Sequence, residues 1–337
     1  MRLVQNPSPS KQRKARLHRE GAEEEGKRMN YRITNIEYGI GPWGSEFIYG
    51  MVGNPCPGAT EQNVHSVTLI QGGGKNILVD TGVDMENPAK KEMWDGLITR
   101  CNGVIWALGQ VNLTPDDIDV VILTHAHIDH IGGVERFGNA RIFIQQDEFE
   151  AWEKMVTDPR YSQLTLPAAM PADYPPMRRM IETGALTLLN GDVVNFLPGV
   201  DIHVARNCHS VAEQVVVVKN TPDEAASPAI VHNEQGDRMV VDSRSPHFAP
   251  LAPKTYIIGG DVALRPANLT GMGNWRGFLA PMLGRSGSAY GVMREYDWIL
   301  DVIDGDMTRL VLTHDSTMTE RFRSEQIDEG LHIHYVC

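Results

Sequence analysis

The sequence lacks any hydrophobic run approaching the ~18 residues that a membrane-spanning helix requires, so it predicts a soluble protein. Cysteine is also scarce, because only four occur in 337 residues and no two form a Cys-x-x-Cys pair. A disulfide framework is therefore not expected, and a reducing compartment, the cytoplasm, is the simplest location. With 42% hydrophobic residues, the chain is still apolar enough to bury a sizeable core.

Positive charge is scarce outside the first 28 residues. The chain has 31 basic and 43 acidic residues, but 8 basic and 4 acidic ones lie in 1–28, so the remainder carries a formal charge near -16. This acidity argues against binding to phosphate backbones. Residues 1–28 have few large apolar side chains and no signal-peptide core, so we predict a disordered tail there and one domain over 29–337. A nucleic-acid arm through Lys11–Arg19 is the alternative.

Short β-rich runs separated by Gly and Asn turns begin at Tyr31. Residues 64–70 and 76–80 predict a hairpin, and the apolar run 120–123 predicts a strand buried on both faces. Further strands are predicted near 140–144, 186–189, 193–196, 200–205, 214–219, 255–259 and 309–312, helices at 86–110, 147–155 and 296–303, and long loops at 156–182 and 264–294. Strands followed by helices, twice over, predict an α/β fold in which two mixed β-sheets pack together with helices outside, an αββα sandwich.

Three histidines and an aspartate lie within six residues directly after the buried strand. They are His125, His127, Asp129 and His130, in the run Leu123-Thr-His-Ala-His-Ile-Asp-His-Ile-Gly-Gly133. Imidazole and carboxylate are ligands of zinc and of other first-row metals. On a loop leaving a strand, the first two can point to one centre and the last two to a neighbouring one. The two glycines that end the run let the backbone turn tightly. A surface histidine cluster without a metal is the alternative.

This run resembles the most specific motif of the metallo-β-lactamase superfamily, and other motifs follow in that family's order over roughly residues 31–325. The segment Asn76-Ile-Leu-Val-Asp-Thr-Gly82 is similar to the strand signature in which the aspartate, here Asp80, orients a ligand histidine. The resemblance implies three further ligands at the ends of later strands: His209 in Cys208-His-Ser210, Asp261 in Ile257-Ile-Gly-Gly-Asp261, and His314 in Val311-Leu-Thr-His314. The Pro-Gly flanks usual in the family are missing around His209.

The resemblance implies two divalent metal ions, with zinc expected first and iron, manganese or cobalt as alternatives. One metal would be held by His125, His127 and His209, the other by Asp129, His130 and His314, and Asp261 would be shared. The implied mechanism is attack by a hydroxide that bridges the metals, with Asp129 and Asp261 as catalytic residues. We expect His65 and His203 to lie outside the ligand set.

The stretch 72–133, followed by Arg141-Ile-Phe-Ile-Gln-Gln-Asp-Glu148, resembles the N-acyl homoserine lactonase group, whose members open a cyclic ester. That group commonly carries a tyrosine three residues after the bridging aspartate, where this chain has Leu264. The candidates to replace that tyrosine are Tyr161, Tyr174 and Tyr290. We therefore predict a hydrolase of a lactone or related ester. An organophosphate triester hydrolase is the alternative, and a glutathione thioester hydrolase or a non-catalytic metal-binding protein stays open.

Methionine and aromatic residues gather in the two long loops. They suit either an apolar substrate pocket or lid, or ordinary core packing and a dimer contact. The residues are Met170, Met177, Met180, Trp275, Phe278, Leu279, Met282 and Leu283. We accordingly expect a small-molecule substrate with an apolar portion as the partner, with no nucleic acid and no membrane, and keep a homodimer as an open alternative. The polar insert at 220–254 is predicted to be a surface flap or an oligomer contact.

Overall fold

The short strand β5 (Val120–Ile122) is buried on both faces and fixes the order of the layers. Its Val121 packs into a core beneath a layer of helices, whereas Val120 and Ile122 pack into a second core between two sheets. The double burial predicted for 120–123 is therefore confirmed. The computed structural model describes residues 30–50, 54–95, 98–161, 168–220, 229–232, 238–241, 254–273, 277–280 and 287–337.

The larger sheet is mixed and runs in the order β15-β16-β1-β2-β3-β5-β6-β7, with β4 paired to β1. Its strands are β1 (Arg32–Gly44), β2 (Thr60–Gly72), β3 (Lys75–Val79), β4 (Arg100–Cys101), β6 (Arg141–Gln145), β7 (Leu186–Leu189), β15 (Arg323–Asp328) and β16 (Leu331–Tyr335), besides β5. The strands β3, β5, β6 and β7 are parallel, and β2 and β3 form the predicted hairpin. Parallel strands end at one edge of the sheet, so the residues that follow β3 and β5 lie side by side there.

The second sheet runs in the order β14-β13-β10-β9-β8 and is also mixed, because β13 and β14 are parallel while its other pairs are antiparallel. Its strands are β8 (Val193–Leu197), β9 (Val200–Arg206), β10 (Ala212–Asn220), β13 (Lys254–Ile258) and β14 (Leu310–Val311). Within the described residues, the strands β11 (Ala229–His232) and β12 (Arg238–Val241) pair with each other and with no other strand. The seven further strands predicted from the sequence therefore exist at or close to the expected positions, in β6 to β10, β13 and β14.

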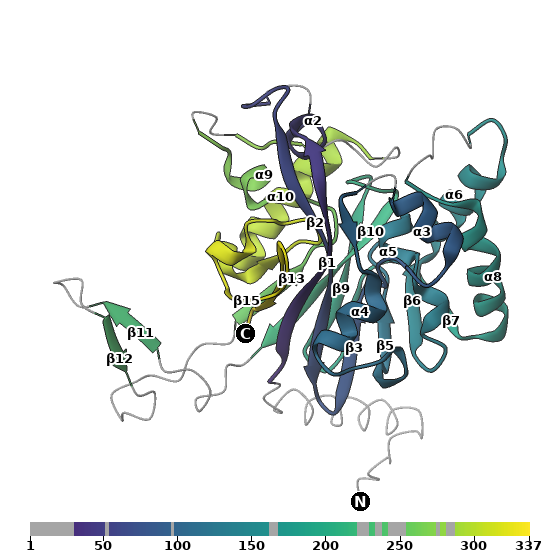
Figure 1. Ribbon diagram of the computed structural model, residues 1–337, viewed down its shortest axis with the longest axis horizontal. Coiled ribbons are helices and arrows are strands. Elements are labelled where there is room, and N and C mark those ends of the chain that lie inside the picture. The colour runs from purple at the N-terminus through teal and green to yellow at the C-terminus, as the bar shows by residue number, and fades with distance from the viewer. Residues whose placement is uncertain are drawn as a thin grey trace, which may run out of the picture.

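Helices cover the outer faces of both sheets (Figure 1). They are α2 (Ser45–Tyr49), α3 (Pro88–Asp95), α4 (Gly103–Gln110), α5 (Ile128–Ile131), α6 (Gln146–Thr157), α8 (Tyr174–Thr183), α9 (Pro266–Thr270) and α10 (Ala289–Ile303). The helices α4, α6 and α8 pack on the larger sheet, and α10 packs on the second sheet through Val292, Tyr296 and Ile299. Three apolar cores therefore separate four layers, and the predicted αββα sandwich of two mixed sheets is confirmed.

Several element predictions were wrong in their extent. The stretch 86–110 forms two helices around β4, because Gly103 adopts a φ of 80° and a Cβ there would lie 2.8 Å from the carbonyl oxygen of Val83. The loop predicted at 156–182 contains α8, whose first turn holds Pro175 and Pro176, where a missing N–H costs nothing. The strand near 309–312 is not the last one, since β15 and β16 follow it and pair beside β1.

Other predictions concern residues outside the described ranges. They include the tail at 1–28, most of the insert at 220–254, and Trp275, Met282 and Leu283. Of the loop residues that are described, Met177 and Leu279 are fully buried in apolar cores, and Met170, Met180 and Phe278 pack against such cores. These side chains therefore serve core packing. No helix in the described part of the chain is long and apolar enough to cross a bilayer.

Candidate metal centre

The loop after β5 and the short helix α5 carry the His-x-His-x-Asp-His run at the edge where the parallel strands end, with Asp129 and His130 in the helix. The close packing of this run against the neighbouring strand end depends on glycine. A Cβ at Gly133 would lie 2.4 Å from the carbonyl oxygen of Thr81, and one at Gly132 would lie 3.0 Å from that of Gly82. Any side chain at these positions would push the two loops apart, so the glycines hold the motif against the end of β3.

Four side chains form the first group of potential ligands. They are His125, His127, His209 and Asp261, each buried, with one ligand atom apiece within 4.8 Å of all the others. The Nε2 atom of His125 lies 2.8 Å from Nδ1 of His127, and Nε2 of His209 lies 3.2 Å from the same atom. His209 follows β9 and Asp261 follows β13, so the second sheet supplies these two residues.

A second group lies beside the first and shares Asp261 with it. His130, Asp261 and His314 form one buried triple, and His65, Asp129 and His314 form another. The Nε2 atom of His314 lies 3.3 Å from Oδ2 of Asp129 and 3.3 Å from Oδ2 of Asp261. The Nε2 atom of His130 lies 3.4 Å from Oδ1 of Asp261. The structure thus brings all seven residues singled out in the sequence to one place, with Asp261 between the two groups.

The donor set fits a pair of divalent metals. Two ligand atoms that each lie 2.0–2.2 Å from one tetrahedral metal are about 3.3–3.6 Å apart, and the distances around His314 and Asp261 fall in that range. Within the described residues, Nε2 of His130, Nε2 of His314 and Oδ1 of Asp261 are buried without a hydrogen-bond partner. Buried polar atoms normally have partners, so these imidazoles and carboxylates have the chemistry of a metal site.

The opposite nitrogens of these histidines are held by protein groups. Nδ1 of His130 lies 2.8 Å from Oδ2 of Asp80, and Nδ1 of His314 lies 2.7 Å from the carbonyl oxygen of Val64. Such contacts leave each Nε2 directed at the carboxylates and fix the ring orientation. Asp80 also accepts a hydrogen bond from the backbone N–H of Thr124 at 2.7 Å, which ties the ends of β3 and β5 together.

Two buried glutamates that the sequence did not single out also support the site. Glu148 of α6 accepts hydrogen bonds from the backbone N–H groups of Ala126 and Ala212 and from the hydroxyl of Ser210. It thereby fixes the backbone between the first two histidines to the segment after His209. Glu213 accepts a hydrogen bond of 2.7 Å from the backbone N–H of Asp261. Nothing in their local sequence distinguishes them from surface glutamates.

The pKa values of the clustered histidines are shifted in opposite directions. Burial, together with the neighbouring imidazole of His209, lowers the pKa of His127 to about 3. Burial acts in the same direction on His314, but the carboxylates of Asp261 and Asp129 outweigh it and raise its pKa to about 9. Burial opposes ionisation of both aspartates as well, yet the neighbouring histidines hold their pKa values well below the usual range. The second group therefore carries protons that a metal would displace.

His65 was expected to lie outside the ligand set, but the structure places it against the second group. It lies in the middle of β2, 1% exposed, with Nδ1 3.3 Å from Oδ2 of Asp129. No local motif marks it, and only the path of β2 past the cluster brings it there. His203 is, as expected, in none of the potential ligand groups of the described residues; it pairs with Glu295 and stacks on Trp298.

The tyrosines considered as replacements for the missing lactonase tyrosine have other surroundings. Tyr174 is buried and donates a hydrogen bond to the carbonyl oxygen of Ala126, so it supports the histidine loop. Tyr290 is 74% exposed, and the guanidinium of Arg160 lies over the ring of Tyr161. Leu264 itself packs in a small core with Ile48, Tyr49 and Leu279. None of these contacts marks a replacement for the tyrosine hydroxyl.

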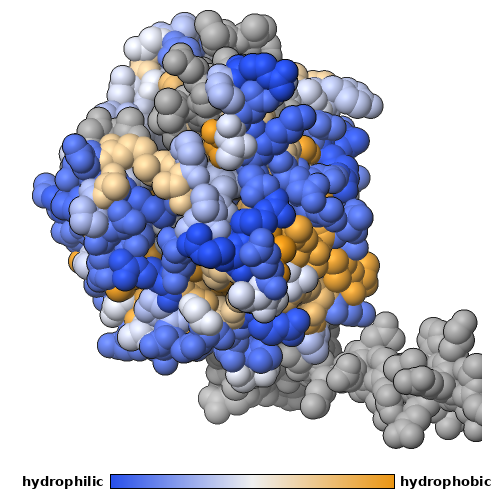
Figure 2. Space-filling model, turned by 90° about the vertical axis from the view of Figure 1, so that its right-hand side faces the viewer, coloured by the Kyte–Doolittle hydropathy of each residue, from blue (hydrophilic) through white to orange (hydrophobic). Residues whose placement is uncertain are grey.

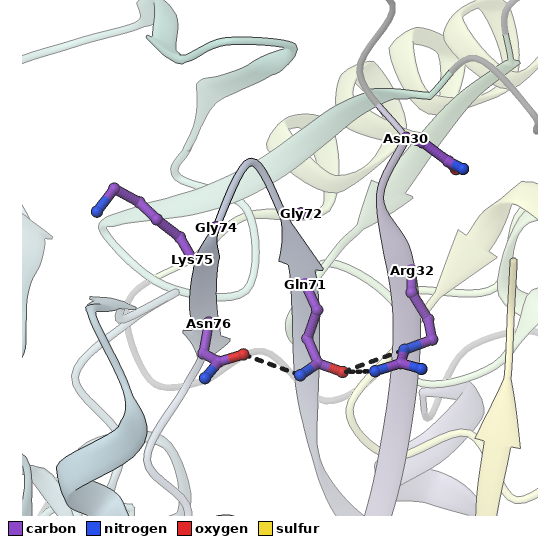
Figure 3. A pocket seen from close by; sticks show the side chains of 7 residues that line it. All are labelled: Asn30, Arg32, Gln71, Gly72, Gly74, Lys75 and Asn76. Carbon is purple, nitrogen blue, oxygen red and sulfur yellow. Dashed lines mark hydrogen bonds between the residues drawn. The ribbon is translucent and has the colours of Figure 1, made fainter.

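A surface pocket of about 360 Å³ lies elsewhere, at the turn of the β2–β3 hairpin. Its lining includes Arg32, Gln71 and Asn76, whose side chains form a chain of hydrogen bonds across three strands (Figure 3). The turn is at the opposite end of β3 from Asp80, so this pocket is separate from the histidine cluster. The face shown in Figure 2 is mainly hydrophilic, with its hydrophobic residues in limited areas.

Comparisons with known proteins agree with this geometry. Residues 61–195 match the family model of the Metallo-beta-lactamase superfamily. An N-acyl homoserine lactonase of Rhizobium rhizogenes is 38% identical over 93 residues, which are 25% of this chain and 33% of that protein. This chain therefore spans about a third of the length of the curated relative.

Solved structures share the fold over most of their length. An N-acyl homoserine lactone hydrolase, with the product N-hexanoyl-L-homoserine at its catalytic metal centre, matches with a TM-score of 0.55 and 17% identity, covering 88% of this chain and 98% of that one. A dizinc quorum-quenching lactonase matches with a TM-score of 0.53 and 15% identity, covering 86% and 89%. At these identities the likeness establishes the fold alone.

Proposed function

We propose that this chain, which carries a metallo-beta-lactamase superfamily domain, is a metal-dependent hydrolase that opens a lactone or related ester at a dinuclear centre. The observation that carries the proposal is the double group of buried histidines and aspartates around Asp261, in which three buried ligand atoms of described residues have no hydrogen-bond partner. Curated relatives that match part of this chain include N-acyl homoserine lactonases, which supports a lactone as the substrate.

The chain's own residues would divide the work between two ions. His125, His127 and His209 would hold the first, and Asp129, His130 and His314 the second, with Asp261 shared. Bound there, two divalent ions would supply an activated water nucleophile and polarise the oxygen that gains charge. We infer zinc, because the donor set of imidazoles and carboxylates suits it and because a lactonase with the same fold is a dizinc protein. Iron, manganese and cobalt fit the same donors.

Aromatic side chains beside His314 support an apolar substituent on the substrate. The ring of Trp43 lies 4.9 Å from that of His314, and the ring of Phe47, 49% exposed, lies 6.1 Å from that of Trp43. Together they lead from the buried cluster to solvent along an apolar path, which is the usual lining of a pocket for an acyl group. Because Leu264 packs in a core and offers no hydroxyl, we infer that the carbonyl oxygen is stabilised without a tyrosine at that position.

The test measures metal content and turnover on the same preparation. The full chain is purified without chelators, its metals are counted by elemental analysis, and it is assayed on lactones of increasing acyl length and on phosphotriesters. We expect about two metals per chain and turnover of lactones. If the protein holds two metals but turns over only phosphotriesters, the substrate is a phosphotriester and the lactone proposal is wrong. Fewer than two metals per chain would contradict the dinuclear centre.

Two variants show whether activity depends on the cluster. Asp261→Asn removes the carboxylate common to both groups and should reduce metal content and lactone turnover together. His203→Gln changes a histidine of β9 that lies outside the potential ligand groups, so it should leave both unchanged. Loss of turnover in Asp261→Asn with two metals retained would assign that carboxylate to the chemistry rather than to metal binding.

A further inference from the structure

His65 lies where a buried polar ring has no structural reason to be. It projects from β2 among the aromatic rings of Trp94 and Trp43, whose centroids are 5.2 Å and 5.7 Å from its own. Its partner across the ladder is Gly39, next to a register shift in β1 after Glu37. A Cβ at Gly39 would lie 3.4 Å from the Cβ of His65, so the two residues are in close contact. Irregular strand pairing of this kind commonly aims a side chain at a site.

The imidazole of His65 is removed from water by burial. It is 1% exposed, and neither ring nitrogen makes a hydrogen bond of acceptable geometry within the described residues. Its nearest polar atom is Oδ2 of Asp129, 3.3 Å from Nδ1. Leaving a buried polar group unsatisfied costs about 1–3 kcal/mol. An apolar residue would suit the surrounding tryptophans better, so the ring is better explained by a partner that is bound there.

The position of His65 relative to the second group identifies that partner. One ligand atom from each of His65, Asp129 and His314 lies within 4.8 Å of the other two, the same criterion that groups His130, Asp261 and His314. The ring centroids of His65 and His314 are 4.8 Å apart at 89°, so the two rings are perpendicular neighbours. Two imidazole nitrogens and a carboxylate oxygen are a sufficient protein donor set for a first-row divalent metal.

We propose that His65 is an additional nitrogen ligand of the second metal. The inference rests on the proposed dinuclear centre and goes beyond its seven-residue ligand set. The second ion would then be held by His65, His130, His314 and Asp129, with the shared Asp261, and β2 would contribute to the site alongside the strand ends. An additional imidazole at the second position would make the two metal positions chemically unequal.

The experiment compares the full chain with His65→Phe, His65→Gln and the control His203→Gln. Each protein is stripped of metal, checked by circular dichroism, and titrated with zinc against a chromophoric chelator. We expect wild type to bind two zinc ions and His65→Phe to keep one of the two affinities unchanged. The affinity of the other should fall by about tenfold or more, since even indirect supporting contacts to metal ligands contribute 10–100-fold. If His65→Phe does not fold, the same measurement is made on His65→Gln.

Loading the protein with cobalt(II) then tests whether His65 binds the metal or only contacts Asp129. Each imidazole on a paramagnetic ion gives its own strongly shifted, solvent-exchangeable N–H resonance, so wild type should show one more such signal than the His65 variants. Equal numbers of signals, or unchanged zinc affinities, would overturn the assignment of His65 as a ligand while leaving the dinuclear centre intact. If wild type itself bound fewer than two ions, the proposed function would fail first, so the two failures are distinguishable.

Discussion

Oδ2 of Asp80 lies 2.8 Å from Nδ1 of His130, at a backbone position where Asp80 adopts a φ of 66°. A left-handed conformation at a residue other than glycine is uncommon, and it costs free energy that the surrounding structure must supply. Here it turns the carboxylate at the end of β3 toward the histidine loop, where it also accepts the N–H of Thr124. The strained residue therefore couples two parallel strands to one ligand.

Asp80→Asn tests this coupling while keeping the backbone, because asparagine tolerates a positive φ. The remaining oxygen still accepts from the backbone N–H of Thr124, while the new amide group opposes Nδ1–H of His130, so the ring of His130 loses its support. We expect zinc affinity at the second position to fall by about 10–100-fold, with a much smaller change in the thermal stability of the metal-free protein. Chelator competition measures the first quantity and circular dichroism the second.

The matched control is Asp95→Asn, which changes an exposed aspartate of α3 that pairs with Lys91. It should change neither the free energy of zinc binding nor the stability of the metal-free protein by more than about 0.5 kcal/mol. Equal zinc affinity for Asp80→Asn and wild type would show that His130 keeps its orientation by packing alone.

Metal binding should release protons in a way that depends on pH. The pKa of His314 is about 9 in the metal-free protein, so its ring is protonated at pH 7.5 and must lose that proton to become a ligand. His127, with a pKa of about 3, is already neutral and releases none. Because the folded-state pKa of His314 is raised, its proton is bound below pH 9 and absent above it. The number of protons released per zinc should therefore fall as the pH rises through about 9.

Calorimetric titration in buffers of different ionisation enthalpy counts these protons directly. At pH 7.5 the observed heat should depend strongly on the buffer, and this dependence should weaken at pH 10. A buffer dependence that is the same at both pH values would contradict the raised pKa of His314.

The sequence predicted the part of the candidate site that lies in local motifs. His125, His127 and His130 occur in one run after a strand that is apolar throughout, and β5 is indeed buried on both faces. The more distant His209, Asp261 and His314 were expected from the resemblance to the metallo-β-lactamase superfamily. Each follows a strand, and a sandwich fold brings the ends of such strands together. Strand ends are easy to predict from apolar runs, which explains why the αββα layers were also predictable.

What the sequence did not predict depends on contacts between distant segments. His65 lies within a strand, where the alternation of side chains gives no indication of a metal, and its neighbour Asp129 belongs to another element. Glu148 lies in a helix whose sequence is ordinary for a surface helix, yet it is fully buried. In both cases the side chain's role follows from which elements meet around it. The edge strand β15 was missed because it is almost entirely polar and charged, whereas β16, which lies between β15 and β1, was missed although its apolar residues alternate with histidines.

Trp43→Ala should distinguish substrates by the length of their acyl chain. Removing this ring takes away apolar contact beside His314 but changes none of the potential ligands themselves. Loss of such contact weakens substrate and transition state equally, so KM should rise while kcat changes little. For a long acyl chain we expect KM to rise about 5–30-fold, which corresponds to roughly 1–2 kcal/mol of apolar burial. Steady-state kinetics with short and long acyl lactones measures it, and an equal effect on both would remove Trp43 from the acyl pocket.

Arg265 connects three segments from a position that is 1% exposed. Its guanidinium donates hydrogen bonds to the backbone carbonyls of Leu264, His314 and Gln62 and to Oδ1 of Asn63. Burial lowers its pKa despite the nearby carboxylate of Asp315, which acts in the opposite direction. The planar fork of arginine can serve four acceptors at once, whereas the single ammonium of lysine cannot reach them all.

Arg265→Lys should therefore leave buried carbonyl oxygens without donors. Each such oxygen costs about 1–3 kcal/mol, so we expect the free energy of unfolding to fall by about 2–5 kcal/mol, measured by urea denaturation in the presence of chelator. Because His314 is one of the residues held, zinc affinity at the second position should fall as well. Arg100→Lys is the control, since that arginine is one-third exposed and its ion pair with Asp328 contributes at most about 1 kcal/mol. A similar, small loss of stability in both variants would mean that water or local rearrangement satisfies the carbonyls around Arg265, and that the orientation of His314 does not depend on the guanidinium.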